Sequence, residues 1–210
     1  DAAEVLPNAL PVPTIPARRF TVYNALGALA CCYDLGIPLA KAIQALEKVP
    51  PVKGRLEVVP VPAPYTVVID YAHTPDALEQ VLADARRVTQ GRLICLFGCG
   101  GDRDKTKRPV MGEIAASLSD LVILTSDNPR TEDPEAILDQ VAAGFPRGFA
   151  DYHREPDRRA AIALALSLGR AGDVILLAGK GHETYQEIGK NRLPLDEREE
   201  IASFFQKSKV

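Results

Sequence analysis

Four polar clusters, each directly after an apolar run, hold the residues of this chain that could do chemistry. They are Asp70-Tyr71-Ala72-His73, Gly98–Lys107 (GCGGDRDKTK), Asp127-Asn128-Pro129-Arg130 and Gly179-Lys180-Gly181-His182-Glu183. Arg103 and Arg130 offer planar forks that suit a carboxylate. Asp127 and Glu183 are anions that suit an ammonium group. A pocket with both signs of charge predicts a zwitterionic ligand, such as a free amino acid.

The same clusters also have plainer interpretations. The run Gly98-x-Gly100-x-x-Arg103 lacks the third glycine of a dinucleotide fingerprint, and no acidic residue ends a strand about 20 residues later, so NAD binding is not favoured. Gly179-Lys180-Gly181 lacks the spacing of a phosphate loop. On composition alone, the glycine-rich run is compatible with a solvated loop and the DNPR segment with an Asx turn. His73 and His182 are compatible with capping or packing histidines.

Short apolar runs alternate with helical stretches from residue 56 onward. We expect strands at 56–61, 66–69, 93–97, 121–125 and 174–178, and helices at 75–89, 108–118, 134–144, 157–168 and 196–206. This alternation predicts a Rossmann-like α/β fold, a doubly wound and mostly parallel sheet that is covered on both faces. Ligands bind outside the carboxyl ends of such strands. The four clusters should therefore face one crevice.

The first part of the chain has a different character. Residues 1–18 are rich in proline and show no regular period, so they predict an irregular lead-in. Two helices are expected next, at 22–35 and 38–48, the second ending before Pro50-Pro51. We interpret this helical pair as the tail of a preceding domain. The predicted domains are residues 1–55 and 56–210.

Composition narrows the class of protein. The chain has 210 residues, a formal net charge of −3 and 46% hydrophobic residues. Such a charge argues against a nucleic-acid partner, and no apolar run approaches the roughly 20 residues of a membrane span. The N-terminus also lacks the layout of a secretory signal. Four cysteines without CxxC spacing, at 31, 32, 95 and 99, favour reduced thiols. We expect a cytoplasmic monomer with no membrane or nucleic-acid partner.

Longer motifs resemble a known family. VIDYAHTPDAL, FGCGGDRDKTKRPVMG, TSDNPRTEDP and LLAGKGHETYQ resemble, in this order, the C-terminal domain of the Mur ligases, and most of all the ligases that add 2,6-diaminopimelate. The resemblance covers about residues 18–206. RRFTVYNALGALACCYDLGIP and VKGRLEVV resemble the end of that family's central ATPase domain. The resemblance thus implies a short helical remnant of the ATPase domain before an amino-acid-binding domain.

The resemblance implies an activity for the complete enzyme. It is an ATP-dependent amide ligase that adds meso-diaminopimelate to UDP-N-acetylmuramoyl-L-alanyl-D-glutamate in peptidoglycan precursor synthesis. ATP phosphorylates the D-glutamate side chain, and the amino group of the incoming amino acid attacks the acyl phosphate. The family's phosphate loop and Mg²⁺ ligands lie upstream of the matching region. We therefore expect no metal ligand in this chain, leave its catalytic residues unassigned, and expect it to be inactive alone.

The resemblance also assigns residues. The positions that match the family's diaminopimelate site are Arg103, Asp127, Asn128, Pro129, Arg130, Gly179 and Glu183. The two arginines would hold the distal carboxylate, and Glu183 with the Gly179 carbonyl would hold the distal ammonium. Lysine-adding relatives lack the arginine of DNPR, since lysine has no distal carboxylate. The positions that match ATP-facing residues are Arg55, Asp70 and His73.

Two alternatives remain open on the sequence. One is a non-catalytic module that only binds an amino acid. The other is a related ligase of the wider superfamily that uses lysine or glutamate, against which the DNPR motif counts.

Overall fold

The computed structural model describes residues 19–207, with side chains from Val22 onward. The chain divides into two compact units, one of them ending at Val52 and the other continuing from Lys53. The lead-in predicted for residues 1–18 lies outside the described residues. The domain boundary that the sequence predicts between residues 55 and 56 stays a prediction. No described helix is long and apolar enough to cross a membrane.

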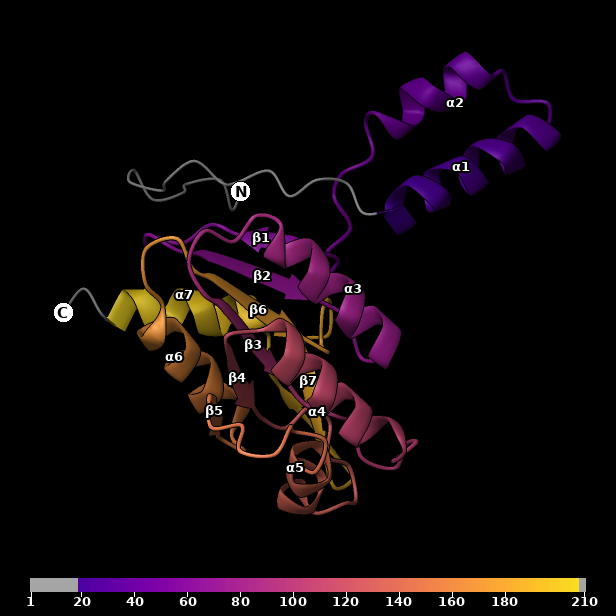
Figure 1. Ribbon diagram of the computed structural model, residues 1–210. Coiled ribbons are helices and arrows are strands. Elements are labelled where there is room, and N and C mark those ends of the chain that lie inside the picture. Colours follow the sequence, from indigo (N-terminus) through magenta and orange to yellow (C-terminus); the bar gives the residue numbers. More distant parts are fainter. Residues whose placement is uncertain (1–18, 208–210) are drawn as a thin grey trace. The chain divides into compact units, whose positions relative to one another are not determined.

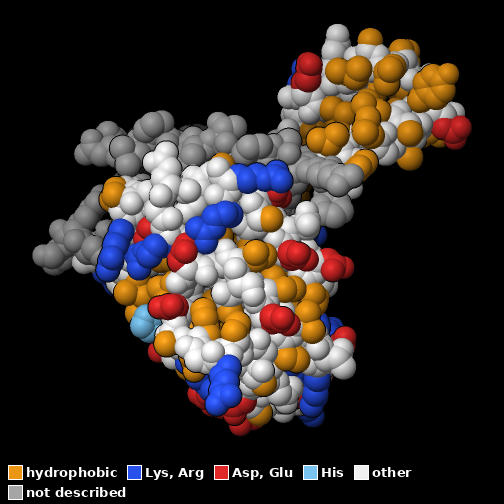
Figure 2. Space-filling model, in the orientation of Figure 1, with side chains coloured by type: hydrophobic (Ala, Val, Ile, Leu, Met, Phe, Trp, Pro, Cys, Tyr) orange, Lys and Arg blue, Asp and Glu red, His pale blue; other side chains and the backbone are white. Residues whose placement is uncertain are grey.

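The first unit is a pair of helices, α1 (Arg19–Asp34) and α2 (Leu39–Leu46), close to the two predicted ones. The residue Gly36 follows α1 with φ of 75°, a left-handed conformation that commonly ends a helix. Much of the unit's apolar surface is exposed: Tyr33 is 74% and Leu35 76% exposed. Figure 2 shows hydrophobic side chains gathered on the visible face of this unit. The pair alone therefore lacks the buried core of a stable domain.

The second unit is built on a six-stranded sheet with the order β1-β2-β6-β3-β4-β5 (Figure 1). The strands are β1 (Glu57–Val59), β2 (Thr66–Asp70), β3 (Leu93–Phe97), β4 (Leu121–Leu124), β5 (Tyr152–Arg154) and β6 (Val174–Ala178). β1 pairs antiparallel with β2, and all other neighbours are parallel. β6 comes last along the chain but lies between β2 and β3. The carboxyl ends of β2, β6, β3 and β4 are thereby neighbours.

Helices cover both faces of this sheet, as Figure 1 shows. On one side lie α3 (Pro75–Arg86), α4 (Lys107–Leu118) and α5 (Pro134–Ala142), and on the other α6 (Arg158–Leu168) and α7 (Glu197–Lys207). Every residue of β3 and β6 is buried, as the uniformly apolar runs require. Alternate strand residues join α6 and α7 in one hydrophobic cluster. The predicted Rossmann-like, doubly wound α/β fold is confirmed.

Three short strands were not predicted. β5 is exposed at all of its positions, and the hairpin of β7 (Tyr185–Ile188) and β8 (Asn191–Pro194) forms a separate two-stranded sheet. None of them contains the apolar run by which the other strands were recognised. The hairpin turns at Gly189, whose φ is 59°. The unpredicted hairpin matters because it packs against the DNPR segment.

Candidate functional site

The loops that follow β2, β3, β4 and β6 lie together at one edge of the sheet. The Gly179 amide donates to the Asp70 carbonyl at 3.0 Å, which joins the loops after β6 and β2. The Gly101 amide donates to the Asn128 carbonyl at 2.8 Å, which joins the loops after β3 and β4. Lys180 Nζ bonds Asp127 and Asn128, which joins the loops after β6 and β4, so clusters far apart in sequence share one site.

A buried lysine lies at the centre of the acidic part of this site. Lys180 is fully buried, and its Nζ lies 3.0 Å from Glu183 Oε2, 2.9 Å from Asn128 Oδ1 and 3.4 Å from Asp127 Oδ1. Asn128 Nδ2 donates to the same Glu183 oxygen at 3.0 Å. With both carboxylates ionised, this group carries one unbalanced negative charge. It therefore suits one further cation, such as the ammonium group of a ligand.

Lys180 was not predicted as a site residue. Gly179-Lys180-Gly181 was compared only with a phosphate loop, whose spacing it lacks. A signal was present, however. A lysine between two glycines at the end of a wholly apolar strand has little room to reach solvent, and a buried ammonium needs carboxylate partners. The acidic residues of the neighbouring loops supply them.

The glycine-rich loop after β3 packs directly on the backbone of the DNPR segment. A β-carbon on Gly98 would overlap the Thr125 carbonyl oxygen, and one on Gly101 would overlap the Pro129 carbonyl oxygen. At these two positions glycine is needed because any side chain would separate the loops. The two segments thus form one continuous wall of the site.

Arg130 is held in place by the protein. Its backbone is left-handed, with φ of 51°, and its amide donates to the Glu187 carbonyl in β7 at 3.0 Å. Its Nε donates to Glu187 Oε2 at 2.9 Å and its Nη1 to the Gly101 carbonyl at 2.9 Å. Hydrogen bonds from Arg192 and Arg130 lower the pKa of Glu187 below its ordinary value, which keeps this partner anionic. Among the described residues nothing accepts from Arg130 Nη2, so this nitrogen, rather than the whole guanidinium, is left as a donor.

Arg103 differs from Arg130 in being exposed and without a hydrogen bond or ion pair in the described part of the chain. The two arginines nevertheless lie together. Arg130 Nη1 is 3.1 Å and Arg103 Cγ 3.7 Å from the place that a β-carbon on Gly100 would take. Arg103 is therefore the cation of the pair without a protein partner among the described residues, and Arg130 is the anchored one.

A buried arginine fixes the loop that carries Arg103. Arg108 is fully buried and donates to both oxygens of Glu132, at 3.0 and 2.9 Å, and to the Gly100 carbonyl at 3.1 Å. Glu132 also accepts from the Asp102 amide at 2.6 Å and pairs with Lys105 at 3.0 Å. The hydrogen bonds from Arg108 hold the pKa of Glu132 well below its ordinary value. One carboxylate thus anchors both ends of the loop.

The loop after β2 is organised around Asp70, which is 1% exposed. One of its carboxylate oxygens accepts from the Leu56 amide at 2.7 Å and the other from the Ala72 amide at 2.9 Å. These bonds tie the turn after β2 to the chain that leads into β1. The Asp70 side chain therefore fixes the shape of this loop.

The ring of Tyr71 brings together the other residues that were predicted to face ATP. The Arg55 guanidinium lies 4.9 Å from the centre of this ring. The rings of His73 and His182 lie 4.6 and 5.0 Å from it. Arg55 and His73 thus share one partner, and this aromatic and basic surface adjoins the loop of Lys180.

The chain that enters the second unit also contacts this site. A β-carbon on Gly54, whose φ is 68°, would overlap the backbone at Gly181. Arg198 donates to the Gly181 carbonyl at 3.2 Å and binds the Glu57 carboxylate. Glu57 in turn accepts from the Gly54 amide at 2.6 Å. Four residues therefore join the start of the unit to the loop that holds Glu183.

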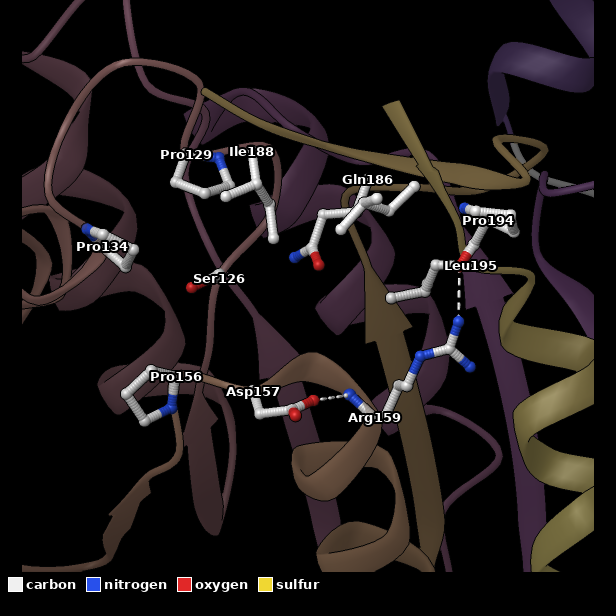
Figure 3. Close-up of a pocket in the computed structure, with 11 residues that line it drawn as sticks. Ser126, Pro129, Pro134, Pro156, Asp157, Arg159, Gln186, Ile188, Pro194 and Leu195 are labelled. Carbon is white, nitrogen blue, oxygen red and sulfur yellow. Dashed lines mark hydrogen bonds between the residues drawn. The ribbon is translucent and has the colours of Figure 1, made fainter. Parts of the chain in front are cut away.

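A pocket of about 490 Å³ lies next to the site, behind the DNPR segment (Figure 3). Its walls are mainly proline and aliphatic side chains, and its polar members are Ser126, Asp157, Arg159 and Gln186. Gln186 Nε2 donates to the Asp127 carbonyl at 2.7 Å. In Figure 3, Asp157 accepts from the Arg159 amide and so caps α6. The charged side chains of the four clusters do not line this pocket, so the charged crevice, rather than this pocket, is the candidate site.

The described residues contain no group of three or more His, Cys, Asp or Glu side chains that could hold a metal ion. The Mg²⁺ that the family resemblance implies does not fit the residues of this part of the chain. We assign no metal ligand to them.

Comparison with known proteins identifies the family. Residues 54–181, more than half of the chain, match the family described as "Mur ligase, glutamate ligase domain". The chain belongs to the Mur ligase family. The matched range contains the first three clusters and the start of the fourth, and Glu183 lies two residues beyond its end.

Curated Mur ligases resemble the chain over most of its length. A UDP-N-acetylmuramoyl-L-alanyl-D-glutamate–2,6-diaminopimelate ligase of Clostridioides difficile is 49% identical over 90% of this chain and 38% of its own length. A ligase of the same name from Synechococcus elongatus is 50% identical over 92% of this chain and 39% of its own length. A solved ligase of that name has a TM-score of 0.73 and 40% identity, over 95% of this chain and 41% of the other. The chain thus spans about two fifths of these relatives.

Proposed function

We propose that this chain is the amino-acid-binding part of an ATP-dependent Mur ligase that adds meso-diaminopimelate to UDP-N-acetylmuramoyl-L-alanyl-D-glutamate. The observation that carries the proposal is the meeting of Arg103 and Arg130 with the acidic group around Lys180 at one sheet edge. The identity of about half of all residues with ligases of this name supports it. A cytoplasmic location and a monomeric state stay predictions.

In this proposal the amino acid is bound through both of its charges. Arg130 Nη2 and the free guanidinium of Arg103 receive the distal carboxylate, each donating charge-assisted hydrogen bonds. The distal ammonium takes the unbalanced negative charge of Glu183 and Asp127, with the Gly179 carbonyl as a further acceptor. Lys180 prevents these two carboxylates from repelling each other when no ligand is bound. Asn128 and Pro129 complete the wall, Asn128 by bonding Glu183.

The chemistry follows from holding the amino acid in place. The ligase transfers the γ-phosphoryl group of ATP to the D-glutamate side chain, and the bound amino group attacks the resulting acyl phosphate. The C–N bond forms, phosphate leaves, and the amine loses a proton. The contribution of this chain is to fix the nucleophile, which converts a bimolecular step into an effectively unimolecular one. We propose that Arg55 and His73 face ATP beside Tyr71, whereas Asp70 joins the turn that carries His73 to the segment that carries Arg55.

Calorimetry on the 210-residue chain tests the proposal. We expect meso-diaminopimelate to bind and L-lysine, which has no distal carboxylate, to bind far more weakly. Arg130→Ala should cost on the order of 2–5 kcal/mol for meso-diaminopimelate, because one arm of a desolvated charge pair is lost. The weaker binding of lysine should change little. Equal affinities for the two amino acids in the wild-type chain would contradict the assignment.

A second measurement separates a ligase from a module that only binds an amino acid. The chain is joined to the upstream domains of one of the ligases that it resembles, and ATP turnover is followed with the muramoyl dipeptide present. We expect ADP formation that depends on meso-diaminopimelate. Tight binding without such turnover would favour the binding module.

A further inference from the structure

A fully buried ion pair lies beneath the candidate site, and none of the roles assigned above uses it. It joins Arg158, the first residue of α6, to Glu197, the first residue of α7, and both are 0% exposed. Arg158 Nε and Nη2 donate to Glu197 Oε1 at 2.9 and 2.7 Å. The pair thus sets the guanidinium in one orientation.

The other donors of this guanidinium bind the ends of two strands. Arg158 Nη1 donates to the Ser126 carbonyl at 3.2 Å, and Nη2 donates to the Ala178 carbonyl at 2.9 Å. Ser126 directly precedes Asp127, and Ala178 directly precedes Gly179. One side chain therefore holds the backbone just before each of the two loops that form the acidic part of the site.

The sheet itself makes no such connection. β3 lies between β4 and β6 in the strand order, so no ladder of hydrogen bonds joins β4 to β6 directly. Beyond the ends of the strands, the spacing of the two loops depends on side chains. Arg158 connects the backbone before the Asp127 loop to the backbone before the Gly179 loop. Glu197 holds its guanidinium in that place.

We propose that Arg158, oriented by Glu197, is a positioning residue that sets the distance between the Asp127 loop and the Gly179 loop for binding of the amino acid. The proposal rests on the proposed function. A buried ion pair adds little net stability over apolar side chains of the same volume, so stability alone gives little reason for one here. A planar guanidinium holds two carbonyls and a carboxylate with donors in a fixed geometry, whereas the three donors of lysine sit on one atom at the end of a flexible stem.

The chain offers a matched control at the opposite end of the same sheet. Arg92 Nε and Nη2 donate to Asp173 Oδ2 at 3.2 and 2.7 Å, and Nη2 also donates to the Leu168 carbonyl at 2.7 Å. Asp173 directly precedes β6 at its amino end. This pair combines the same groups but does not contact the site.

The experiment compares Arg158→Lys with Arg92→Lys in the full chain. Calorimetry should show that Arg158→Lys weakens binding of meso-diaminopimelate about tenfold or more, since small displacements of binding groups have large effects. Arg92→Lys should leave the affinity within about twofold. Amide hydrogen exchange should rise in residues 127–130 and 179–183 of Arg158→Lys and stay unchanged there in Arg92→Lys. Glu197→Asp, which keeps the charge but shortens the reach, replaces Arg158→Lys if that variant does not fold.

The outcomes separate the two proposals. If Arg158→Lys and Arg92→Lys bind equally well and exchange alike in both loops, the positioning role is wrong. If the wild-type chain binds no meso-diaminopimelate, the proposed function fails, and the exchange data alone then decide whether Arg158 orders the loops.

Discussion

Replacing Lys180 by methionine tests whether the site depends on a buried positive charge. Two unit charges 3.0 Å apart, the separation of Lys180 and Glu183, attract by about 5.5 kcal/mol at an effective dielectric constant near 20. Desolvation offsets part of this attraction, and breaking a buried pair costs about 3–5 kcal/mol. In Lys180→Met, Asp127 and Glu183 would also face each other without a cation. We expect the free energy of unfolding to fall by about 3–5 kcal/mol, or Tm by about 6–20 °C at this chain length.

Lys105→Met is the matched control for this prediction. Lys105 also lies 3.0 Å from a carboxylate, that of Glu132, but its side chain is 60% exposed and that of Lys180 is fully buried. An exposed pair of this kind should contribute about 1 kcal/mol or less. Urea unfolding measures the loss of stability in both variants. A loss in Lys180→Met no larger than that in Lys105→Met would refute the argument.

Three further predictions follow from other contacts. In Glu132→Gln, the loss of stability should be complete above about pH 4.5 and shrink below it, because Arg108 depresses the carboxyl pKa and its stabilisation is lost as pH falls through the folded value; a gap that is constant in urea unfolding from pH 7 to pH 3 would contradict this. Gly101→Ala should cost about 1–3 kcal/mol in thermal unfolding, because its β-carbon would overlap the Pro129 carbonyl; an unchanged Tm would show that the loop adapts. Burial raises the pKa of the Cys99 thiol to about 12, so at pH 8 iodoacetamide should modify Cys99 only after unfolding, whereas the exposed Cys31 should react in the folded chain; peptide mapping that finds Cys99 rapidly alkylated in the folded chain would exclude that burial.

The sequence predicted the parts of the fold that apolar patterning controls. The five strands with continuous apolar runs were found, and with them the edge at which the polar clusters meet. The β7–β8 hairpin was missed because its strands are short and largely polar, although Gly189-Lys190 is a plausible turn. Because this hairpin was not predicted, the ion-pair partner of Arg130 was not predicted either, since Glu187 lies on β7. Sequence could suggest that Arg130 is a free fork but could not show that Glu187 and Gly101 already hold it.

Buried charged side chains are the other feature that could not be predicted from the sequence. Lys180, Arg108 and Arg158 are each fully buried, yet on composition they look like ordinary surface residues. Their partners lie 3 to 53 residues away along the chain, most of them in other loops or helices. Only the strand order brings these partners together. Local propensity therefore predicted the elements, whereas the side chains that set the spacing of the site required the structure.

The contact between Gly54 and Gly181 has a mechanical consequence. Because the two backbones touch without any side chain between them, there is no soft layer to absorb a displacement. The Glu57–Arg198 ion pair and the bond from Arg198 to the Gly181 carbonyl hold the same two segments together. A side chain introduced at Gly54 or Gly181 would therefore have to push the segment before β1 away from the turn that bears Glu183.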